Sequence, residues 1–129
     1  MPPPKSATFY DNRTFRSTSN SATGEVSPAT TFRYHQSAAQ PHIVWAEYSG
    51  GSIVRGNLIA TVARDGSNAL DMRYHHVNES GELMTGRCRS TPEVLGDGRL
   101  RMHERWVWTS GGQGEGESVI EEVEGEGGS

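Results

Sequence analysis

The sequence predicts an all-β protein in which an antiparallel up-and-down meander of about eight strands closes into a small barrel. Turns marked by glycine recur at intervals of roughly 8 to 16 residues, and the runs between them have the character of strands rather than helices. A meander of this length in a small protein removes its unpaired edges most simply by closing on itself. The five turns are Gly50-Gly51, Asp65-Gly66-Ser67, Glu79-Ser80-Gly81, Gly96-Asp97-Gly98 and Ser110-Gly111-Gly112.

The composition indicates a single domain and argues against several classes of function. The 129 residues carry 12 Lys+Arg and 16 Asp+Glu, a formal net charge of -4, so we expect no nucleic-acid partner. Cys88 is the only cysteine, which excludes an intrachain disulfide and a multi-cysteine metal site. No run approaches the ~18 apolar residues of a membrane helix, so we expect no membrane association. The start of the chain lacks the apolar region of a secretory signal, and we therefore expect a cytoplasmic protein.

We divide the chain into one folded domain and two tails. Residues 1–8 are rich in proline, and residues 124–129 consist of glycine, glutamate and serine, so both ends are expected to be disordered. Residues 9–123 are expected to form the barrel, with a longer polar loop over 20–29. The strands are expected near residues 14–19, 30–36, 42–49, 52–62, 69–78, 82–91, 99–108 and 116–123.

Two turns in the second half of the chain predict how three strands pair. Glu79-Ser80-Gly81 fits a three-residue hairpin loop, with Gly81 supplying a positive φ, and it pairs residue 78 with residue 82. Gly96-Asp97-Gly98 fits a second such loop and pairs residue 95 with residue 99. Because side chains alternate along a strand, both turns direct the same set of residues inward.

The turn at Gly50-Gly51 is expected to be a two-residue loop that pairs residues 49 and 52. This register turns Glu47 inward and places Trp45 opposite Gly56, where the glycine leaves room for the large ring. The inward face is then expected to hold Ile43, Trp45, Glu47, Leu58, Ala60, Val62, Leu70, Met72, Tyr74, His76, Met84, Cys88, Leu100, Met102, Glu104, Trp106 and Trp108.

Aromatic and polar residues gather toward one end of this predicted interior. A carboxylate is rarely buried without a partner, so an inward Glu47 indicates a wet cavity or a dedicated partner. Aromatic walls with a few convergent polar groups are typical of small-molecule sites. The alternative is that Glu47 lies in solvent at a strand end and that His76 is a hydrogen-bonded rim residue. The candidate ligand-binding residues are Trp45, Glu47, Tyr74, His76, Trp106 and Trp108.

A second hypothesis is an enzyme whose acid–base groups are Glu104 and His76. Glu104 is expected opposite Ser90, deep in the interior. Pairing of residue 108 with residue 118 would also bring Glu122 close to it, and two close carboxylates raise one pKa toward neutrality. We expect a binding protein rather than an enzyme.

Charged residues of the later strands are expected on the outer face. Asp71 and Glu93 fall opposite Arg89 and Arg101, so neutralising cross-strand pairs are expected there rather than an anion site. The outward basic residues are Arg73, Arg87, Arg89, Arg99, Arg101, His103 and Arg105.

The histidines do not predict a metal site. Adjacent strand residues point to opposite faces, so His75 and His76 cannot bind one ion together. His35, His75 and His103 share the outward face but lie on strands that are not neighbours. No phosphate-binding or dinucleotide-binding motif is present, and we expect no metal and no cofactor.

Four segments carry a resemblance to a known group of proteins. They are Phe32-Arg33-Tyr34-His35-Gln36, Val44-Trp45-Ala46-Glu47-Tyr48-Ser49-Gly50-Gly51, Gly81-Glu82-Leu83-Met84-Thr85-Gly86 and the stretch from Asp97 through Trp108. Over roughly residues 15–123 the chain resembles short uncharacterised bacterial proteins, some of which carry the name N-acetylglutamate synthase. The architecture is similar to lipocalin and fatty-acid-binding barrels, an analogy of fold alone.

The name N-acetylglutamate synthase implies an acyl-CoA-binding loop at the start of a helix. The string Gln113-Gly114-Glu115-Gly116-Glu117-Ser118 imitates such a loop only in part, because Ser118 replaces its last small residue and the acidic side chains would repel phosphates. No long helix is expected after it. We therefore do not expect this synthase activity.

Our leading hypothesis is a barrel that binds a small, partly apolar molecule between its tryptophans, oriented by hydrogen bonds from Tyr74, His76 and Glu47. A third hypothesis is an interaction module, because an outward apolar strip would suit a homodimer. The residues of that strip are Val44, Ala46, Tyr48 and Ile53.

Overall fold

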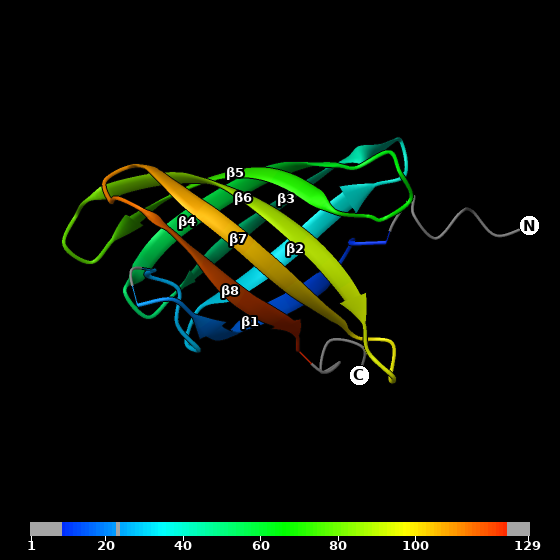
Figure 1. The fold of residues 1–129 in the computed structure, drawn as a ribbon, viewed down its shortest axis with the longest axis horizontal. Helices are drawn as coiled ribbons and strands as arrows, with labels where there is room; N and C mark the ends of the chain where they lie inside the picture. Colours follow the sequence, from blue (N-terminus) through cyan, green and yellow to red (C-terminus); the bar gives the residue numbers. More distant parts are fainter. Residues whose placement is uncertain (1–8, 23, 124–129) are drawn as a thin grey trace, which may run out of the picture.

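The protein folds as a closed eight-stranded antiparallel barrel in which each strand pairs with the next and β8 pairs with β1, as the computed structural model shows (Figure 1). The predicted fold class is thus confirmed. The structure describes residues 9–22 and 24–123, and the expected tails 1–8 and 124–129 lie outside these residues. The strands are β1 (Arg13–Asn20), β2 (Thr31–Ser37), β3 (Gln40–Gly50), β4 (Ile53–Val62), β5 (Leu70–Asn78), β6 (Leu83–Val94), β7 (Leu100–Ser110) and β8 (Glu115–Glu122).

The two three-residue turns set the register as predicted. Across β5 and β6, Tyr74 pairs with Gly86 and His76 with Met84. Across β6 and β7, Glu104 pairs with Ser90. The glycine of each loop has a positive φ, which a residue without Cβ adopts readily. Buried and more exposed residues therefore alternate along β5 and most of β6, so that apolar side chains fill the barrel interior.

The predicted register of β3 on β4 is wrong. The loop lies one residue further along the chain, so that Gly50 pairs with Ile53, and a bulge separates this pair from Tyr48 and Gly56. The φ of Gly50 is 117°, a conformation open to glycine and strained for other residues. The net shift is an odd number of residues, which exchanges the two faces of β3.

Tyr48, rather than Trp45, therefore packs over Gly56 in the barrel. A Cβ at Gly56 would overlap the Tyr48 ring, so the glycine makes room for an aromatic side chain as expected, but for a different one. Trp45 and Glu47 point outward, with Trp45 41% exposed. The proposed dimer strip is wrong for the same reason, because all four of its residues are buried in the interior: Val44, Ala46, Tyr48 and Ile53.

The last strand also differs from the expected pairing. Ser118 lies opposite Glu104, four residues away from the expected partner, because β7 continues to Ser110 and leaves only a short turn before β8. Glu122 is consequently remote from Glu104 in the register and instead binds Arg13 at 2.6 Å. The expected pair of interior carboxylates does not form. β8 closes the barrel through pairing with β1, where a bulge falls between Ser17 and Ser19.

The barrel has two different ends. At the closed end, the segment before β1 covers the interior: the Tyr10 ring is fully buried, its backbone N–H donates to Gln36 Oε1 at 2.8 Å, and its hydroxyl donates to the Asn68 carbonyl. Beneath it lies a layer of fully or almost fully buried side chains. They are Phe15, Tyr34, Leu70, Leu100, Met102 and Ile120.

The other end, here called the mouth, carries the loop between β1 and β2 together with the β3–β4, β5–β6 and β7–β8 turns (Figure 1). The loop between β1 and β2 is called the mouth loop, and its residues 24–30 run back over the interior. Thr30 is buried and holds the loop to β3, since its hydroxyl donates to the Gly50 carbonyl at 3.1 Å. The mouth is therefore built from segments far apart in the sequence.

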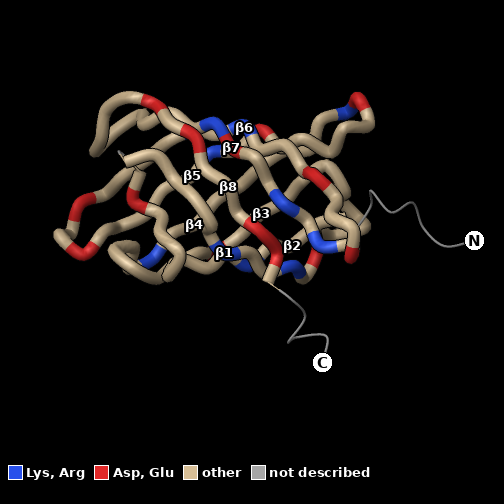
Figure 2. The backbone as a smooth tube through the Cα atoms, turned by 60° about the horizontal axis from the view of Figure 1, so that its bottom comes forward, with Lys and Arg blue, Asp and Glu red and all other residues tan. Residues whose placement is uncertain are grey.

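The outer surface carries intermingled acidic and basic residues rather than a single charged face (Figure 2). Arg101 binds Glu121 at 2.7 Å and Glu93 at 3.5 Å, and His103 also contacts Glu93 at 2.8 Å. The predicted cross-strand pair of Glu93 with Arg101 is confirmed, whereas Asp71 binds Arg73 of its own strand at 2.7 Å. Within the described residues, the chain forms no helix that is long and apolar enough to cross a membrane.

Candidate functional site

A cavity of about 50 Å³ lies in the barrel under the mouth loop. A volume of this size holds a few water molecules at most, since one water needs about 10–15 Å³ on this measure. Most of the lining is apolar, and two carboxyl groups and one imidazole, those of Glu25, Glu104 and His76, also line it. The lining residues are Asn20, Gly24, Glu25, Val26, Phe32, Tyr48, Leu58, Met72, Tyr74, His76, Cys88, Glu104, Trp106, Trp108 and Ser118.

Aromatic rings form one wall of the cavity. The rings of Trp106 and Trp108 lie 5.6 Å apart between centroids, and Tyr74 meets Trp108 edge to face at 5.9 Å. These contacts follow from the register, because residues 74, 106 and 108 occupy inward positions on β5 and β7 and Gly86 lies between their strands. Edge-to-face geometry is favourable for aromatic pairs and fixes the orientation of the rings.

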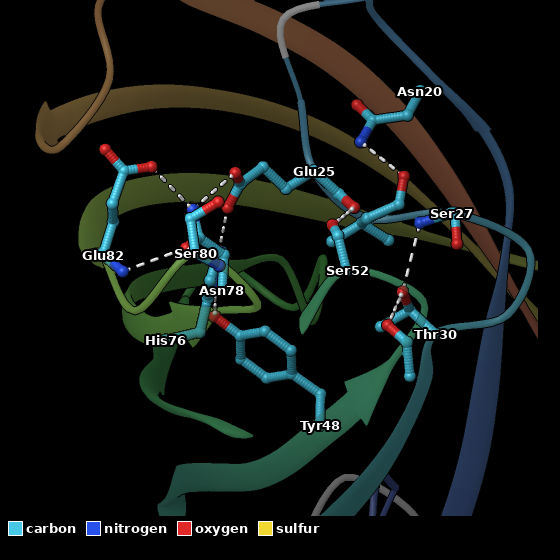
Figure 3. A network of polar contacts seen from close by, with 12 residues as sticks. Asn20, Glu25, Ser27, Thr30, Tyr48, Ser52, His76, Asn78, Ser80 and Glu82 are labelled. Carbon is cyan, nitrogen blue, oxygen red and sulfur yellow. Dashed lines mark hydrogen bonds and ion pairs between the residues drawn. The ribbon is translucent and has the colours of Figure 1, made fainter. Parts of the chain in front are cut away.

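His76 is the centre of a buried hydrogen-bonded chain, shown in Figure 3. Its side chain is 1% exposed, and the ring packs edge to face against Trp108. Nδ1 lies 3.0 Å from the Tyr48 hydroxyl, and Nε2 lies 2.7 Å from Glu25 Oε1. Burial raises the pKa of Tyr48, so its hydroxyl keeps its proton and is a neutral hydrogen-bond partner of Nδ1. The carboxylate of Glu25 then accepts from Nε2–H, and both ring nitrogens have partners.

Asn78, two residues further along β5, is a second donor to the same carboxylate. Its Nδ2 lies 2.9 Å from Glu25 Oε2 and 3.1 Å from Glu82 Oε1. The orientation of this amide is fixed, because Oδ1 accepts from the backbone N–H groups of Ser80 and Glu82, each at 3.0 Å. Glu25 therefore places its two oxygens on two prearranged donors (Figure 3).

The mouth loop that carries Glu25 is tied to the barrel wall at several points. Asn20 Nδ2 donates to the Val26 carbonyl at 3.0 Å, while its Oδ1 accepts from Trp106 Nε1 at 3.2 Å. Ser52 Oγ donates to the Glu25 carbonyl at 3.3 Å. One side chain, Asn20, thus links the loop directly to a cavity tryptophan.

Glu104, on β7, is the second carboxyl group that lines the cavity. The hydroxyls of Ser118 and Ser90 donate to its two oxygens at 3.0 and 3.3 Å. Burial raises the pKa of Glu104 to about 7, although the two serine hydrogen bonds act in the other direction. Near neutral pH this group therefore exchanges between a charged acceptor and a neutral donor.

Cys88 also faces the cavity, between Met72 and Trp106 in the cross-strand row. Burial raises the pKa of the thiol well above its ordinary value, with a further contribution from Glu104. A thiol in this state behaves as a small apolar side chain, and its predicted inward position is confirmed.

The structure brings together four of the six predicted ligand-binding residues, namely Tyr74, His76, Trp106 and Trp108. The inward placement of Trp45 and Glu47 is wrong. On the outside of the barrel, Trp45 stacks on His35 with centroids 5.5 Å apart, and Glu47 binds the same imidazole at 2.6 Å.

Both predicted acid–base residues line the same cavity. Their catalytic role stays a prediction. His76 has a partner on each ring nitrogen while Glu25 is in place, so the imidazole offers a substrate no free nitrogen in this arrangement.

Sequence reasoning missed Glu25, Tyr48 and Asn20. Glu25 lies in a polar loop with no periodicity, and nothing local indicates that it reaches into the barrel. The predicted register of β3 on β4 turns Tyr48 outward, because it exchanges the two faces of the whole strand. The signal that could have revealed Tyr48 is Gly56, since a glycine within a strand marks close approach of a large ring from either neighbouring strand.

The two adjacent histidines point to opposite faces of β5, as expected, with His75 exposed and His76 buried. Within residues 9–22 and 24–123, no group of three or more His, Cys, Asp or Glu side chains is arranged to hold a metal ion.

Comparison with known proteins identifies the family. The profile of the family described as "Avidin-like protein" matches residues 8–123, which is most of the chain and the whole barrel. No curated protein and no solved structure matches the chain. The match extends over all eight strands and agrees with the closed antiparallel meander described above, and the chain belongs to the avidin-like protein family.

Proposed function

We propose that the protein binds a small, partly apolar molecule at the mouth of the barrel. The observation that supports this most strongly is the cavity, in which Tyr74, Trp106 and Trp108 form an aromatic wall and His76 supplies a hydrogen-bonding group. An aromatic wall with a few convergent polar groups is typical of small-molecule sites. Membership of the avidin-like family supports the same class of function.

The present volume limits what the cavity holds. Sites for metabolite-sized ligands have volumes of about 300–1,000 Å³, whereas this cavity measures about 50 Å³. The loop side chains Glu25 and Val26 line it from the open side, so a ligand of that size has to displace them. Binding is therefore expected to be accompanied by movement of the mouth loop.

The intrinsic fluorescence of the protein offers a direct test. Trp45 is on the outer face, so Trp45→Phe leaves Trp106 and Trp108 as the only tryptophans and makes emission a report on the cavity. This variant is screened by thermal shift and emission against a metabolite panel that includes biotin, because the family is described as avidin-like. A bound compound should raise the midpoint of unfolding and change the emission.

The control is Trp108→Leu, which removes part of the cavity wall. Compounds that bind at the mouth should lose at least tenfold in affinity to this variant and keep their affinity for Trp45→Phe. The reverse pattern, with binding lost in Trp45→Phe and kept in Trp108→Leu, would place the ligand on the outer face and contradict the proposal.

A further inference from the structure

The carboxylate of Glu25 occupies a site inside the mouth that is built independently of it, and we propose that this site receives the carboxylate of an apolar or aromatic carboxylic acid in exchange for Glu25. The inference rests on the proposed function and names the class of ligand. Its elements are two fixed donors, an apolar cavity beside them, and an acidic side chain that competes from the mouth loop.

The two donors match a carboxylate. His76 Nε2 and Asn78 Nδ2 contact different oxygens of the Glu25 carboxylate, at 2.7 and 2.9 Å. Both contacts join a charged acceptor to a donor that is held within the barrel, and hydrogen bonds of this type are shorter and stronger than neutral ones. A ligand with a single acceptor atom would satisfy only one of the two donors.

Neither donor depends on Glu25 for its position. His76 is held by the Tyr48 hydroxyl on its other nitrogen and by its T-shaped contact with the Trp108 ring. Asn78 is held by two backbone N–H groups of the β5–β6 turn, which bind its side-chain oxygen. When Glu25 withdraws, both donors therefore keep their orientation and face the space that its carboxylate leaves, next to the cavity that His76 lines.

Withdrawal without replacement is costly, which favours an acid over a neutral ligand. A buried donor that loses its acceptor is left unsatisfied, which is unfavourable. A carboxylic acid restores both hydrogen bonds. Its apolar part can rest on Leu58, Met72 and the two tryptophans, which border the same cavity. An apolar molecule without an acceptor would bury the donors unsatisfied.

Glu25 is also better suited to exchange than the other groups of the network. Its side chain is 24% exposed, against 1% for His76, and it is carried by the loop rather than by a strand. Because Glu25 belongs to the same chain as the two donors, its carboxylate competes with a free acid at a high effective concentration. Removing it should therefore tighten the binding of a free acid.

The test is calorimetric titration of phenylacetate, with phenylacetamide as the uncharged match of the same shape. We expect Glu25→Ala to bind phenylacetate at least tenfold more tightly than the wild-type protein does, with no comparable gain for phenylacetamide. Glu82→Ala is the matched control, because it removes the same charge from the same Asn78 amide but leaves Glu25 in place. Its affinity for phenylacetate should equal that of the wild type.

Two further variants keep the result decisive. His76→Phe in the Glu25→Ala background should abolish the gain, because one of the two donors is lost. If Glu25→Ala does not fold, Glu25→Gln replaces it; its amide retains one acceptor atom, so the gain should be smaller and of the same sign.

Three outcomes would overturn the inference: no gain for phenylacetate in a folded Glu25 variant, an equal gain for phenylacetate and phenylacetamide, or a gain that survives the loss of His76. The second outcome would leave the barrel as a binder of apolar molecules without an acid site, so the proposed function would stand. Failure of the proposed function itself has a different signature, namely ligand binding that is lost with Trp45 rather than with Trp108.

Discussion

The two ends of the barrel are built from the same sheet but differ in the side chains that fill them. At the closed end, Tyr10 and a layer of apolar side chains fill the interior, and Tyr10 finds hydrogen-bond partners in Gln36 and Asn68. At the mouth, a carboxylate, an imidazole and an amide replace apolar packing, and a cavity remains. Burial of apolar area supplies most folding free energy, so the closed end is expected to stabilise the fold and the mouth to provide the site.

A matched pair of leucines tests this difference most strongly. Leu100 at the closed end is fully buried, and Leu58 borders the cavity at the mouth. Leu100→Ala should lower the free energy of unfolding by about 4 kcal/mol and Leu58→Ala by about 2 kcal/mol, within the range known for such substitutions. Urea unfolding of both variants measures the difference. Equal losses would show that the mouth is packed as firmly as the closed end.

Glu104, between the two ends, gives the next largest effect. Its ordinary pKa is 4.5, and burial raises it to about 7 in the folded protein. Between these values the folded state binds more protons than the unfolded chain, so stability falls as the pH rises from about 4.5 to 7. The loss is on the order of 3 kcal/mol at most, since one pKa unit corresponds to about 1.4 kcal/mol.

Glu104→Gln should remove this decline and make the protein more stable than the wild type at pH 8. Urea unfolding at pH 5, 6, 7 and 8 measures both proteins. Glu115→Gln, an exposed acidic residue of β8, is the control and should retain the decline. A flat wild-type profile over this range would contradict the raised pKa.

Asn20 connects the mouth loop to the barrel and should give a smaller effect. Asn20→Ala removes its hydrogen bonds to the Val26 carbonyl and from Trp106 Nε1, at a cost of about 1–2 kcal/mol. Hydrogen exchange locates the change. Amides near Glu25 should exchange faster in the variant, whereas that of Tyr10, buried at the closed end, should keep its protection. Faster exchange at both ends would mean that the loop supports the whole barrel.

Trp45 should give the smallest effect of all. It is 41% exposed on the outer face of β3, so Trp45→Phe should change the free energy of unfolding by less than about 0.5 kcal/mol. Thermal unfolding measures this directly. A loss of 2 kcal/mol or more would contradict the outward placement.

The fold and the part of the site on β5 and β7 could be predicted from the sequence, because each turn between these strands is compatible with only one register. Gly81 and Gly98 each supply one residue of positive φ to a three-residue loop, and the face of every residue follows from that. The inward positions of His76, Trp106 and Trp108 were predicted from these two turns. A short turn sets the register of its two strands through residues that are close in the sequence, so the register can be predicted from the local sequence.

The sequence failed at β3 because both faces of that strand carry apolar residues. Alternation could not distinguish the face of Trp45 from the face of Tyr48, so the register depended on the turn alone. Two adjacent glycines permit more than one loop, and the bulge at Gly50 selects the one that was not expected. Glu25 could not be predicted for another reason, since its carboxylate contacts residues more than 50 positions away in the sequence.

The side-chain amide of Asn78 has two structural roles. Its oxygen organises the hairpin between β5 and β6, and its nitrogen faces Glu25 and Glu82. Aspartate, the nearest substitute in size, could still cap the hairpin but would set a third negative charge against the other two. The shape of one surface turn and the chemistry of the mouth thus depend on a single side chain, so a substitution at Asn78 changes both together.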